Sequence, residues 1–234
     1  MSRNEVRIIG GLWKGRKLKI PANVSARPTL GRVRETLFNW LAGEIEGGDC
    51  LDLFAGSGAL GFEALSRGAR SVVLVDNNRN TAEALKQNAK RLGAANCTVR
   101  RQSALAFLKS ATARGTPAVA RPATATTGRL VSGGPDRHEA QSGATARDMQ
   151  TMEPGLVDGL GGTRLQWDLV FLDPPFASNL LAAALEALRS GHALRPGAKI
   201  YFELERRAKF DPGDFAILKE GKAGDARFGL LASP

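Results

Sequence analysis

A run of four residues in the second half of the chain combines a carboxylate, two prolines and an aromatic ring: Asp173-Pro174-Pro175-Phe176. The prolines stiffen the backbone and remove donors, which leaves carbonyl oxygens directed outward. A nucleobase amine that donates to the Asp173 carboxylate and the Pro174 carbonyl would become pyramidal, with its lone pair aimed at an electrophile. Phe176 offers a ring on which the base can stack. We therefore expect Asp173, Pro174 and Phe176 to be catalytic and Pro175 to contact the substrate.

This chemistry does not identify the base. Guanine presents donors at both N1 and N2, which suits an ionised, acceptor-only carboxylate. Adenine-N6 methyltransferases, however, also carry an Asp-Pro-Pro-aromatic motif. A strand that merely ends in prolines, with a phenylalanine in the core, is the structural alternative. The motif alone therefore indicates an exocyclic amine and leaves guanine and adenine open.

A glycine-rich loop before a predicted helix supplies the other half of the chemistry. Residues 51–61 contain the spacing G-x-G-x-x-G after a strand, and Asp76 follows twenty residues beyond Gly56. Both features also fit a dinucleotide site, and the glycines alone fit a structural tight turn. Asp52, inside the strand, would repel a pyrophosphate and attract the ammonium and sulfonium groups of S-adenosylmethionine. We therefore expect this cofactor, held by Asp52, Phe54, Ala55, Gly56, Ser57, Gly58, Asp76 and Asn77.

Alternating strands and helices must position these two motifs. The pattern predicts strands at Cys50–Phe54, Ser71–Asp76, Cys97–Arg101, Trp167–Leu172 and Lys199–Leu204, with weaker ones near 216–219 and 227–231. It predicts helices at Ala59–Arg67, Arg79–Leu92, Ala104–Lys109 and Asn179–Leu188. Such units form an α/β, Rossmann-like fold whose parallel sheet is covered on both faces, with ligands beyond the carboxyl ends of the strands.

The composition changes between about residues 110 and 165. This stretch is rich in Ala, Thr, Gly, Arg and Ser and contains no lysine and no periodicity. It would bury too little apolar area to offset its conformational entropy, so we expect a flexible insertion. Because it joins a helix end to a strand start, it should emerge away from the active site.

Positive charge is concentrated in the first 45 residues. They hold nine Lys or Arg against three Glu, which accounts for +6 of the formal net charge of +10. Residues 5–20 predict a small hairpin, and a helix opens at Pro28-Thr29. Cations in the first turns of that helix oppose its macrodipole, which favours an anion nearby, although a solvated face is the simpler alternative. We expect this extension to bind nucleic acid through Arg7, Lys14, Arg16, Lys17, Arg27, Thr29, Arg32 and Arg34.

On these residues the chain resembles the RsmD-type 16S ribosomal RNA guanine-N2 methyltransferases. The resemblance is carried by Arg7-Ile8-Ile9-Gly10-Gly11 with residues 15–18, by Arg27-Pro28-Thr29 with residues 32–41, by residues 54–61 with 63–67, and by residues 173–176. It implies a seven-stranded S-adenosylmethionine-dependent methyltransferase fold whose basic extension grips 16S rRNA in an assembling small subunit. It also implies that Asp76 takes the cofactor ribose and that Ser103 and Ala104 lie at the adenine. Ser103 departs from the Asp or Asn common there, and the insertion is a second departure.

Several functional classes are disfavoured. Two cysteines and two well-separated histidines predict no metal site, and no apolar run approaches the roughly 18 residues of a membrane helix. The start lacks the apolar core of a signal peptide, so we expect a cytoplasmic protein. We also expect a monomer. We divide it into a basic RNA-binding extension, 1–45, and a methyltransferase domain, 46–234. The alternatives are a DNA adenine-N6 methyltransferase, for which no target-recognition domain is seen, a non-catalytic RNA-binding assembly factor, and a dinucleotide oxidoreductase.

Overall fold

A seven-stranded sheet forms the centre of the protein in a computed structural model that describes residues 5–20, 31–113, 166–176 and 178–234. Its strands are β3 (Asp49–Asp52), β4 (Ser71–Asp76), β5 (Cys97–Arg101), β6 (Trp167–Leu172), β7 (Leu194–Glu205), β8 (Ala216–Ala223) and β9 (Ala226–Ala232). They run in the order β5-β4-β3-β6-β7-β9-β8. The first five are parallel, and β9 inserts antiparallel between β7 and β8. The predicted α/β class with seven strands is confirmed.

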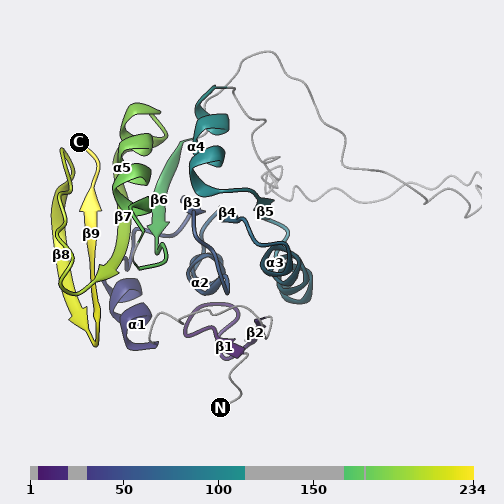
Figure 1. The fold of residues 1–234 in the computed structure, drawn as a ribbon. Coiled ribbons are helices and arrows are strands. Elements are labelled where there is room, and N and C mark those ends of the chain that lie inside the picture. The colour runs from purple at the N-terminus through teal and green to yellow at the C-terminus, as the bar shows by residue number, and fades with distance from the viewer. Residues whose placement is uncertain (1–4, 21–30, 114–165, 177) are drawn as a thin grey trace, which may run out of the picture.

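Helices cover both faces of this sheet (Figure 1). On one face lie α1 (Gly31–Trp40), α2 (Ala59–Ser66) and α3 (Arg79–Leu92), and on the other lie α4 (Ala104–Ala113) and α5 (Leu180–Ser190). Side chains alternate along each strand: in β6, Phe171 packs toward α1 and α2, and Leu172 toward α5. The two buried clusters explain why the central strands read as continuous apolar runs. No helix among the described residues is long and apolar enough to cross a membrane.

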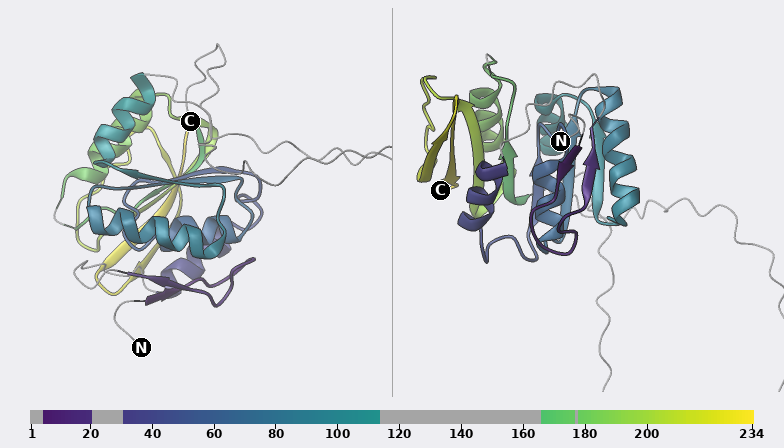
Figure 2. Two further views of the ribbon diagram at one scale, coloured as in Figure 1. Left: turned by 90° about the vertical axis from the view of Figure 1, so that its right-hand side faces the viewer. Right: turned by 90° about the horizontal axis from the view of Figure 1, so that it is seen from below.

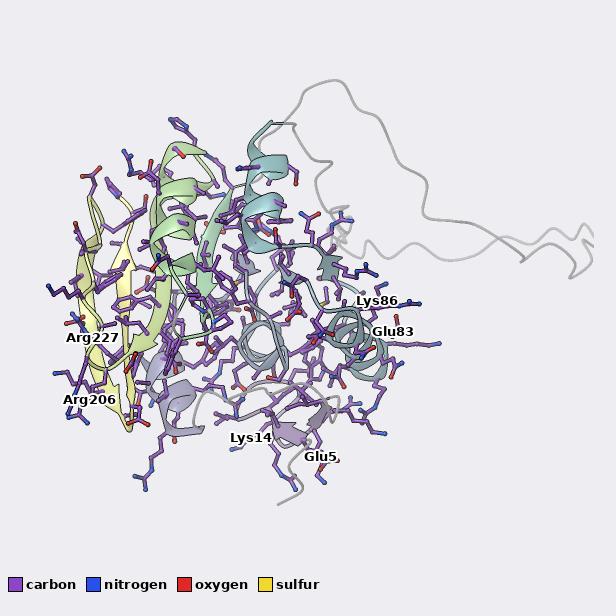
Figure 3. All side chains as sticks on the ribbon, viewed as in Figure 1. Glu5, Lys14, Glu83, Lys86, Arg206 and Arg227 are labelled. Atoms are coloured by element: carbon purple, nitrogen blue, oxygen red, sulfur yellow. The ribbon has the colours of Figure 1, made fainter. Side chains whose placement is uncertain are left out.

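The first part of the chain forms a separate antiparallel pair, β1 (Glu5–Arg7) and β2 (Lys17–Lys19), within the range predicted for a hairpin. The hairpin lies against α2 and α3 (Figure 2). Its residue Lys14 extends away from the sheet (Figure 3). Leu37 and Phe38 of α1 are at most 1% exposed and belong to the same buried cluster as β3 and β6. Residues 5–20 and 31–45 therefore pack onto the main fold.

Some boundaries differ from the prediction. Helix α4 runs to Ala113, so residues 110–113, expected in the insertion, are helical. The reason is tertiary packing, because Ala111 is buried and Phe107 contacts Trp167 at the start of β6. The rest of the predicted insertion, and Pro28-Thr29 as the helix start, lie outside the described residues. Strand β7 begins earlier than predicted, at Leu194.

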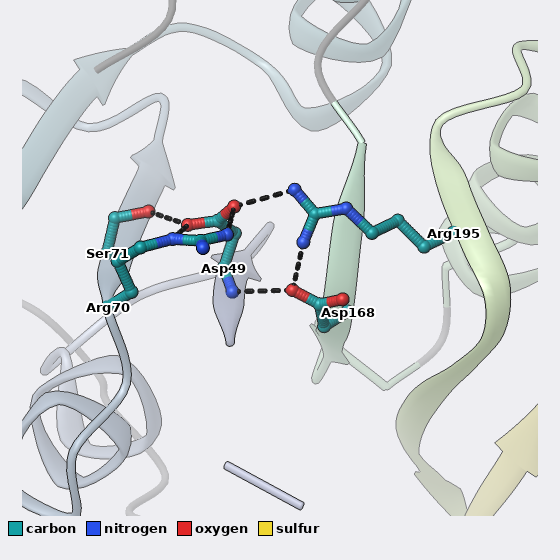
Figure 4. Close-up of polar contacts among 5 residues, drawn as sticks. All are labelled: Asp49, Arg70, Ser71, Asp168 and Arg195. Atoms are coloured by element: carbon teal, nitrogen blue, oxygen red, sulfur yellow. Dashed lines mark hydrogen bonds and ion pairs between the residues drawn. The ribbon is translucent and has the colours of Figure 1, made fainter. Parts of the chain in front are cut away.

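Charged residues tie together the starts of four parallel strands (Figure 4). The Asp49 carboxylate of β3 accepts hydrogen bonds from Arg70, from the Ser71 hydroxyl at 2.7 Å and from Arg195 at 2.8 Å. Arg195 also pairs with Asp168 of β6, whose carboxylate accepts from the Asp49 amide at 2.8 Å. Burial alone would raise the pKa of Asp49, but the hydrogen bonds from Arg70, Ser71 and Arg195 lower that pKa to about 2. This network holds together the amino-terminal ends of these strands, opposite their carboxyl ends.

Candidate active site

A cavity of about 780 Å³ opens at the carboxyl ends of β3, β4, β6 and β7. It brings together both sequence motifs: all four residues of Asp173–Phe176 line it, as does every predicted cofactor residue except Gly58. Four acidic side chains face it, Asp52, Asp76, Asp173 and Glu203. Among the described residues, the lining includes no Lys or Arg. The cavity is therefore suited to a ligand with cationic or hydrogen-bond-donating groups.

The glycine loop between β3 and α2 is shaped by left-handed backbone. Gly56 has φ 50° and Gly58 has φ 76°, conformations that glycine adopts without steric cost. A Cβ on Gly56 would meet no atom closer than 3.8 Å, so its backbone is open to the cavity. A Cβ on Gly58 would lie 2.6 Å from side-chain atoms of Leu85 and Phe62. Gly58 thus supports the loop from beneath and does not line the cavity.

Asp76, the last residue of β4, braces this loop. Its Oδ2 accepts from the Gly56 amide at 3.0 Å and its Oδ1 accepts from the Asn78 amide at 2.8 Å. Burial raises the pKa of Asp76, and the two backbone donors oppose that shift. A carboxylate has about four acceptor positions, so each oxygen still has capacity for a ligand hydroxyl. The residue predicted to bind the ribose therefore also shapes the loop.

Asp52 lies under the loop at the end of β3. It is 2% exposed, and its Oδ2 accepts from the Gly61 amide at 3.2 Å. Burial raises the pKa of Asp52 to about 7, against the hydrogen bonds from the Gly61 and Phe54 amides, and the charge of Asp76 adds to the rise. Asp52 therefore titrates near neutrality, and a cation in the cavity would favour its ionised form.

The segment after β6 is a short turn on the rim of the same cavity. Asp173 and Phe176 are half-buried, Pro174 is buried and Pro175 is exposed. The Ser178 hydroxyl donates to the Pro175 carbonyl at 2.6 Å, which fixes the turn. Because β6 lies next to β3 in the sheet, the Asp173 end of the segment is brought beside the glycine loop.

Two functional features were missing from the sequence prediction. Glu203 of β7 lines the cavity, is 6% exposed and accepts from the Tyr201 hydroxyl at 2.9 Å. Its only sequence signal is one acid inside the apolar run Ile200–Leu204. Gln102 and Thr81 also line the cavity, although neither belongs to a motif.

The second missing feature is the anchor of the hairpin. The Glu63 carboxylate of α2 is fully buried and accepts from the amides of Ile9 and Gly10, both at 2.7 Å. At the end of the same helix, the Ser66 hydroxyl donates to the Gly10 carbonyl at 2.6 Å. Gly11 has φ 72°, and a Cβ there would lie 1.8 Å from the Ser66 carbonyl oxygen. Glycine at position 11 is thus required by the close contact with α2.

Those predicted nucleic-acid residues that the structure describes lie outside the cavity lining. Those that are described and exposed are Arg7, Lys14, Arg16, Lys17 and Arg32. Lys17 pairs with Glu5 at 2.6 Å, and Arg16 donates to the Arg91 carbonyl at 2.5 Å. Arg34 differs: it is 5% exposed and donates to the Arg7 carbonyl at 3.1 Å, which leaves little of it for RNA. Arg27 and Thr29 lie outside the described residues.

Metal ligation has no counterpart in the described part of the chain. No group of three or more His, Cys, Asp or Glu side chains gathers there in a way that could hold an ion. Both cysteines are free, and burial raises the pKa of the Cys97 thiol to about 12.

Comparisons with known proteins match nearly the whole chain. Residues 6–119 and 140–232 match the family model described as conserved hypothetical protein 95. The chain is 35% identical to ribosomal RNA small subunit methyltransferase D of Haemophilus influenzae, over 98% of this chain and 94% of that protein. The Escherichia coli K12 protein of the same name is 34% identical, with 97% and 89% covered. A solved structure of the Escherichia coli protein yhhF is 33% identical, with a TM-score of 0.68 over 97% of both chains.

Proposed function

The chain belongs to the RsmD family of small-subunit ribosomal RNA methyltransferases, and from this premise we propose that it methylates the exocyclic N2 amine of a guanine in 16S rRNA. The methyl donor in this proposal is S-adenosylmethionine. One observation carries the proposal: the Asp-Pro-Pro-Phe turn and the glycine loop share a single cavity.

The lining fits S-adenosylmethionine better than a dinucleotide. The open backbone at Gly56 admits close approach of a ligand, and Asp76 offers acceptors for ribose hydroxyls. Asp52 supplies negative charge for the ammonium and sulfonium groups. A pyrophosphate would instead face acidic side chains, with no Lys or Arg from the described residues in the lining. The volume of about 780 Å³ lies in the usual range for ligand sites.

Residues of the β6 turn would hold the reacting amine. The Asp173 carboxylate and the Pro174 carbonyl accept hydrogen bonds from its two protons, and Phe176 provides a stacking surface for the base. S-adenosylmethionine, when bound, supplies an electrophilic methyl group. No strong base is required beforehand, because the amine proton becomes acidic only once the nitrogen is alkylated. Asp173 is then in place to accept that proton.

RNA contact is assigned to the exposed cations of the hairpin and of α1: Arg7, Lys14, Arg16, Lys17 and Arg32, with Arg27 and Thr29 between them in sequence. Such side chains neutralise phosphates and position the RNA. The relatives are named for the small subunit, which supports 16S rRNA as the partner and the cytoplasm as the compartment. We propose that the protein acts as a monomer.

The central test replaces the acceptor of the amine. Asp173→Ala should lower kcat by about a hundredfold or more, the scale for loss of one preorganised transition-state contact, while cofactor affinity changes less. The substrate is the small subunit from cells lacking this protein, and the modified nucleotide is mapped after reaction. Asp214→Ala, an exposed acid outside the cavity lining, is the control. Wild-type-like turnover of Asp173→Ala would refute its role.

The same assay separates the alternatives. Mass spectrometry of nucleosides should detect N2-methylguanosine in rRNA and no N6-methyladenine in DNA. RNA binding without methyl transfer would identify an assembly factor. Calorimetry that detected binding of NAD but not of S-adenosylhomocysteine would identify a dinucleotide enzyme.

A further inference from the structure

Glu203 occupies a position in the sheet that the proposed reaction leaves unused. Strands β6 and β7 are parallel, with Leu172 opposite Phe202. The residue after Phe202 in β7 is Glu203, and the residue that follows Leu172, the last residue of β6, is Asp173. Adjacent strands lie about 4.8 Å apart, so these two acids are neighbours at the strand ends. Both line the cavity.

Both acids lie close to Tyr201, because, in addition to burial, the charges of Glu203 and Asp173 raise the pKa of its hydroxyl. Tyr201 is opposite Phe171 in β6, and the centroids of the two rings are 6.4 Å apart on the face covered by α1 and α2. Glu203 follows Tyr201 with the strand period of two, and Asp173 is two residues beyond Phe171, one residue past the end of β6. The Tyr201 hydroxyl donates to Glu203 Oε2 at 2.9 Å and fixes the carboxylate from beneath.

Glu203 is one of the buried polar side chains, at 6% exposure. A buried carboxyl group is stabilised by hydrogen-bond donors near it. The Tyr201 hydroxyl is one such donor, and burial together with the charges of Glu203 and Asp173 raises the pKa of that tyrosine. Facing a cavity, Glu203 can also accept from a donor on a ligand.

We propose that Glu203 determines base specificity by accepting a hydrogen bond from N1–H of the target guanine, while Asp173 accepts from the adjacent N2 amine. The inference rests on the proposed guanine-N2 activity. In guanine the ring N1–H and the exocyclic amine are neighbouring donors on one edge, and two carboxylates from neighbouring strands match that pair. In adenine the position beside the amine is an unprotonated acceptor, which a carboxylate repels. Selection therefore combines attraction for guanine with rejection of adenine.

The test uses 2-aminopurine, which keeps the exocyclic amine but has an acceptor at N1. Small subunits are reconstituted with 16S rRNA that carries either guanine or 2-aminopurine at the methylated position. Wild type should prefer guanine in kcat/KM by roughly a hundredfold or more, because a site built around a donor rejects an analogue that lacks it. In Glu203→Gln the amide oxygen can accept from Tyr201, and the amide NH₂ can donate to N1. The preference should fall to within about tenfold.

Tyr201→Phe is the second variant. It removes the hydroxyl that orients Glu203 without adding a donor, so the guanine preference should fall by a smaller factor, roughly threefold to tenfold. Thermal unfolding and binding of S-adenosylhomocysteine verify that each variant is folded. If Glu203→Gln does not fold, the base preference of Tyr201→Phe decides whether Glu203 contributes to base specificity.

The outcomes separate this inference from the proposed function. If wild type places the methyl group elsewhere than guanine N2, the proposed function fails, and the specificity role fails with it. If wild type methylates guanine N2 while Glu203→Gln and Tyr201→Phe slow both bases by the same factor, only the role of Glu203 is overturned.

Discussion

Asp52 is a buried carboxylic acid, 2% exposed, held under the glycine loop. Its pKa of about 7, raised mainly by burial, means that its charge changes in the physiological range. The ionised form is the one that attracts a cationic ligand. Binding of a cationic ligand beside Asp52 would therefore depend on pH, whereas Asp49, at the opposite end of β3, keeps its charge down to a pH of about 2.

This difference leads to a prediction at the residue scale. Affinity for S-adenosylmethionine should increase by up to about tenfold between pH 5.5 and 7.5, as Asp52 loses its proton. Asp52→Asn should weaken binding at pH 7.5 and flatten the profile. Calorimetry across this pH range measures the affinity of the wild type and of Asp52→Asn. S-adenosylhomocysteine, which lacks the sulfonium charge, is the control ligand, and its affinity should depend less on pH. A steep profile in Asp52→Asn would assign the dependence to another group.

At the scale of elements, α2 and the hairpin depend on a close contact that only glycine permits. Gly11 and Gly15 both have positive φ, at 72° and 81°, but only Gly11 is crowded. A Cβ on Gly15 would meet nothing within 4 Å, whereas one on Gly11 would collide with the Ser66 carbonyl. The two glycines form a matched pair that separates backbone strain from packing.

We expect Gly15→Ala to lower the free energy of unfolding by about 1–2 kcal/mol, the cost of left-handed backbone. Gly11→Ala carries the same cost plus roughly 1–3 kcal/mol for the collision. Denaturant unfolding measures both values. Gly11→Ala should also weaken RNA binding more than Gly15→Ala, because it displaces the hairpin from α2. Equal RNA affinities would argue that the hairpin does not contact RNA.

Elements with local signals were predictable from sequence. Apolar periodicity indicated β4, β6, α2 and α3, and the two motifs indicated which strand ends line the cavity. Glu63 and Glu203 were not predictable, because their roles depend on partners far along the chain: Glu63 binds amides 53 and 54 residues away. Arg34 reads as an exposed cation at the start of a helix, yet the hairpin covers it. Pairing between distant elements is what a single sequence does not reveal.

In the whole molecule, the cavity and the two chain ends that flank residues 114–165 lie at opposite ends of the parallel strands. Ala104 at the start of α4 lines the cavity, so the end of that helix at Ala113 points away from it. Strand β6 starts at Trp167, near the Asp49 network, and runs toward the cavity. Ala113 and Trp167 thus both lie at the end of the sheet away from the cavity.

This arrangement predicts tolerance to shortening. Deletion of residues 120–139, which the family model leaves unmatched, should keep kcat and KM for the small subunit within about twofold of wild type. A variant in which the same residues are replaced by a Gly/Ser sequence of equal length separates length from composition. A large rise in KM for both variants would instead implicate the segment in substrate binding.

Helix α2 has eight residues and is about 12 Å long. Its two ends contact different parts of the molecule. Its first turn follows directly from the glycine loop, and its last turn carries the hairpin through Glu63 and Ser66. Because the helix is short and rigid, a tilt of one end also moves the other end. A displacement of the hairpin would therefore be transmitted along α2 to the glycine loop.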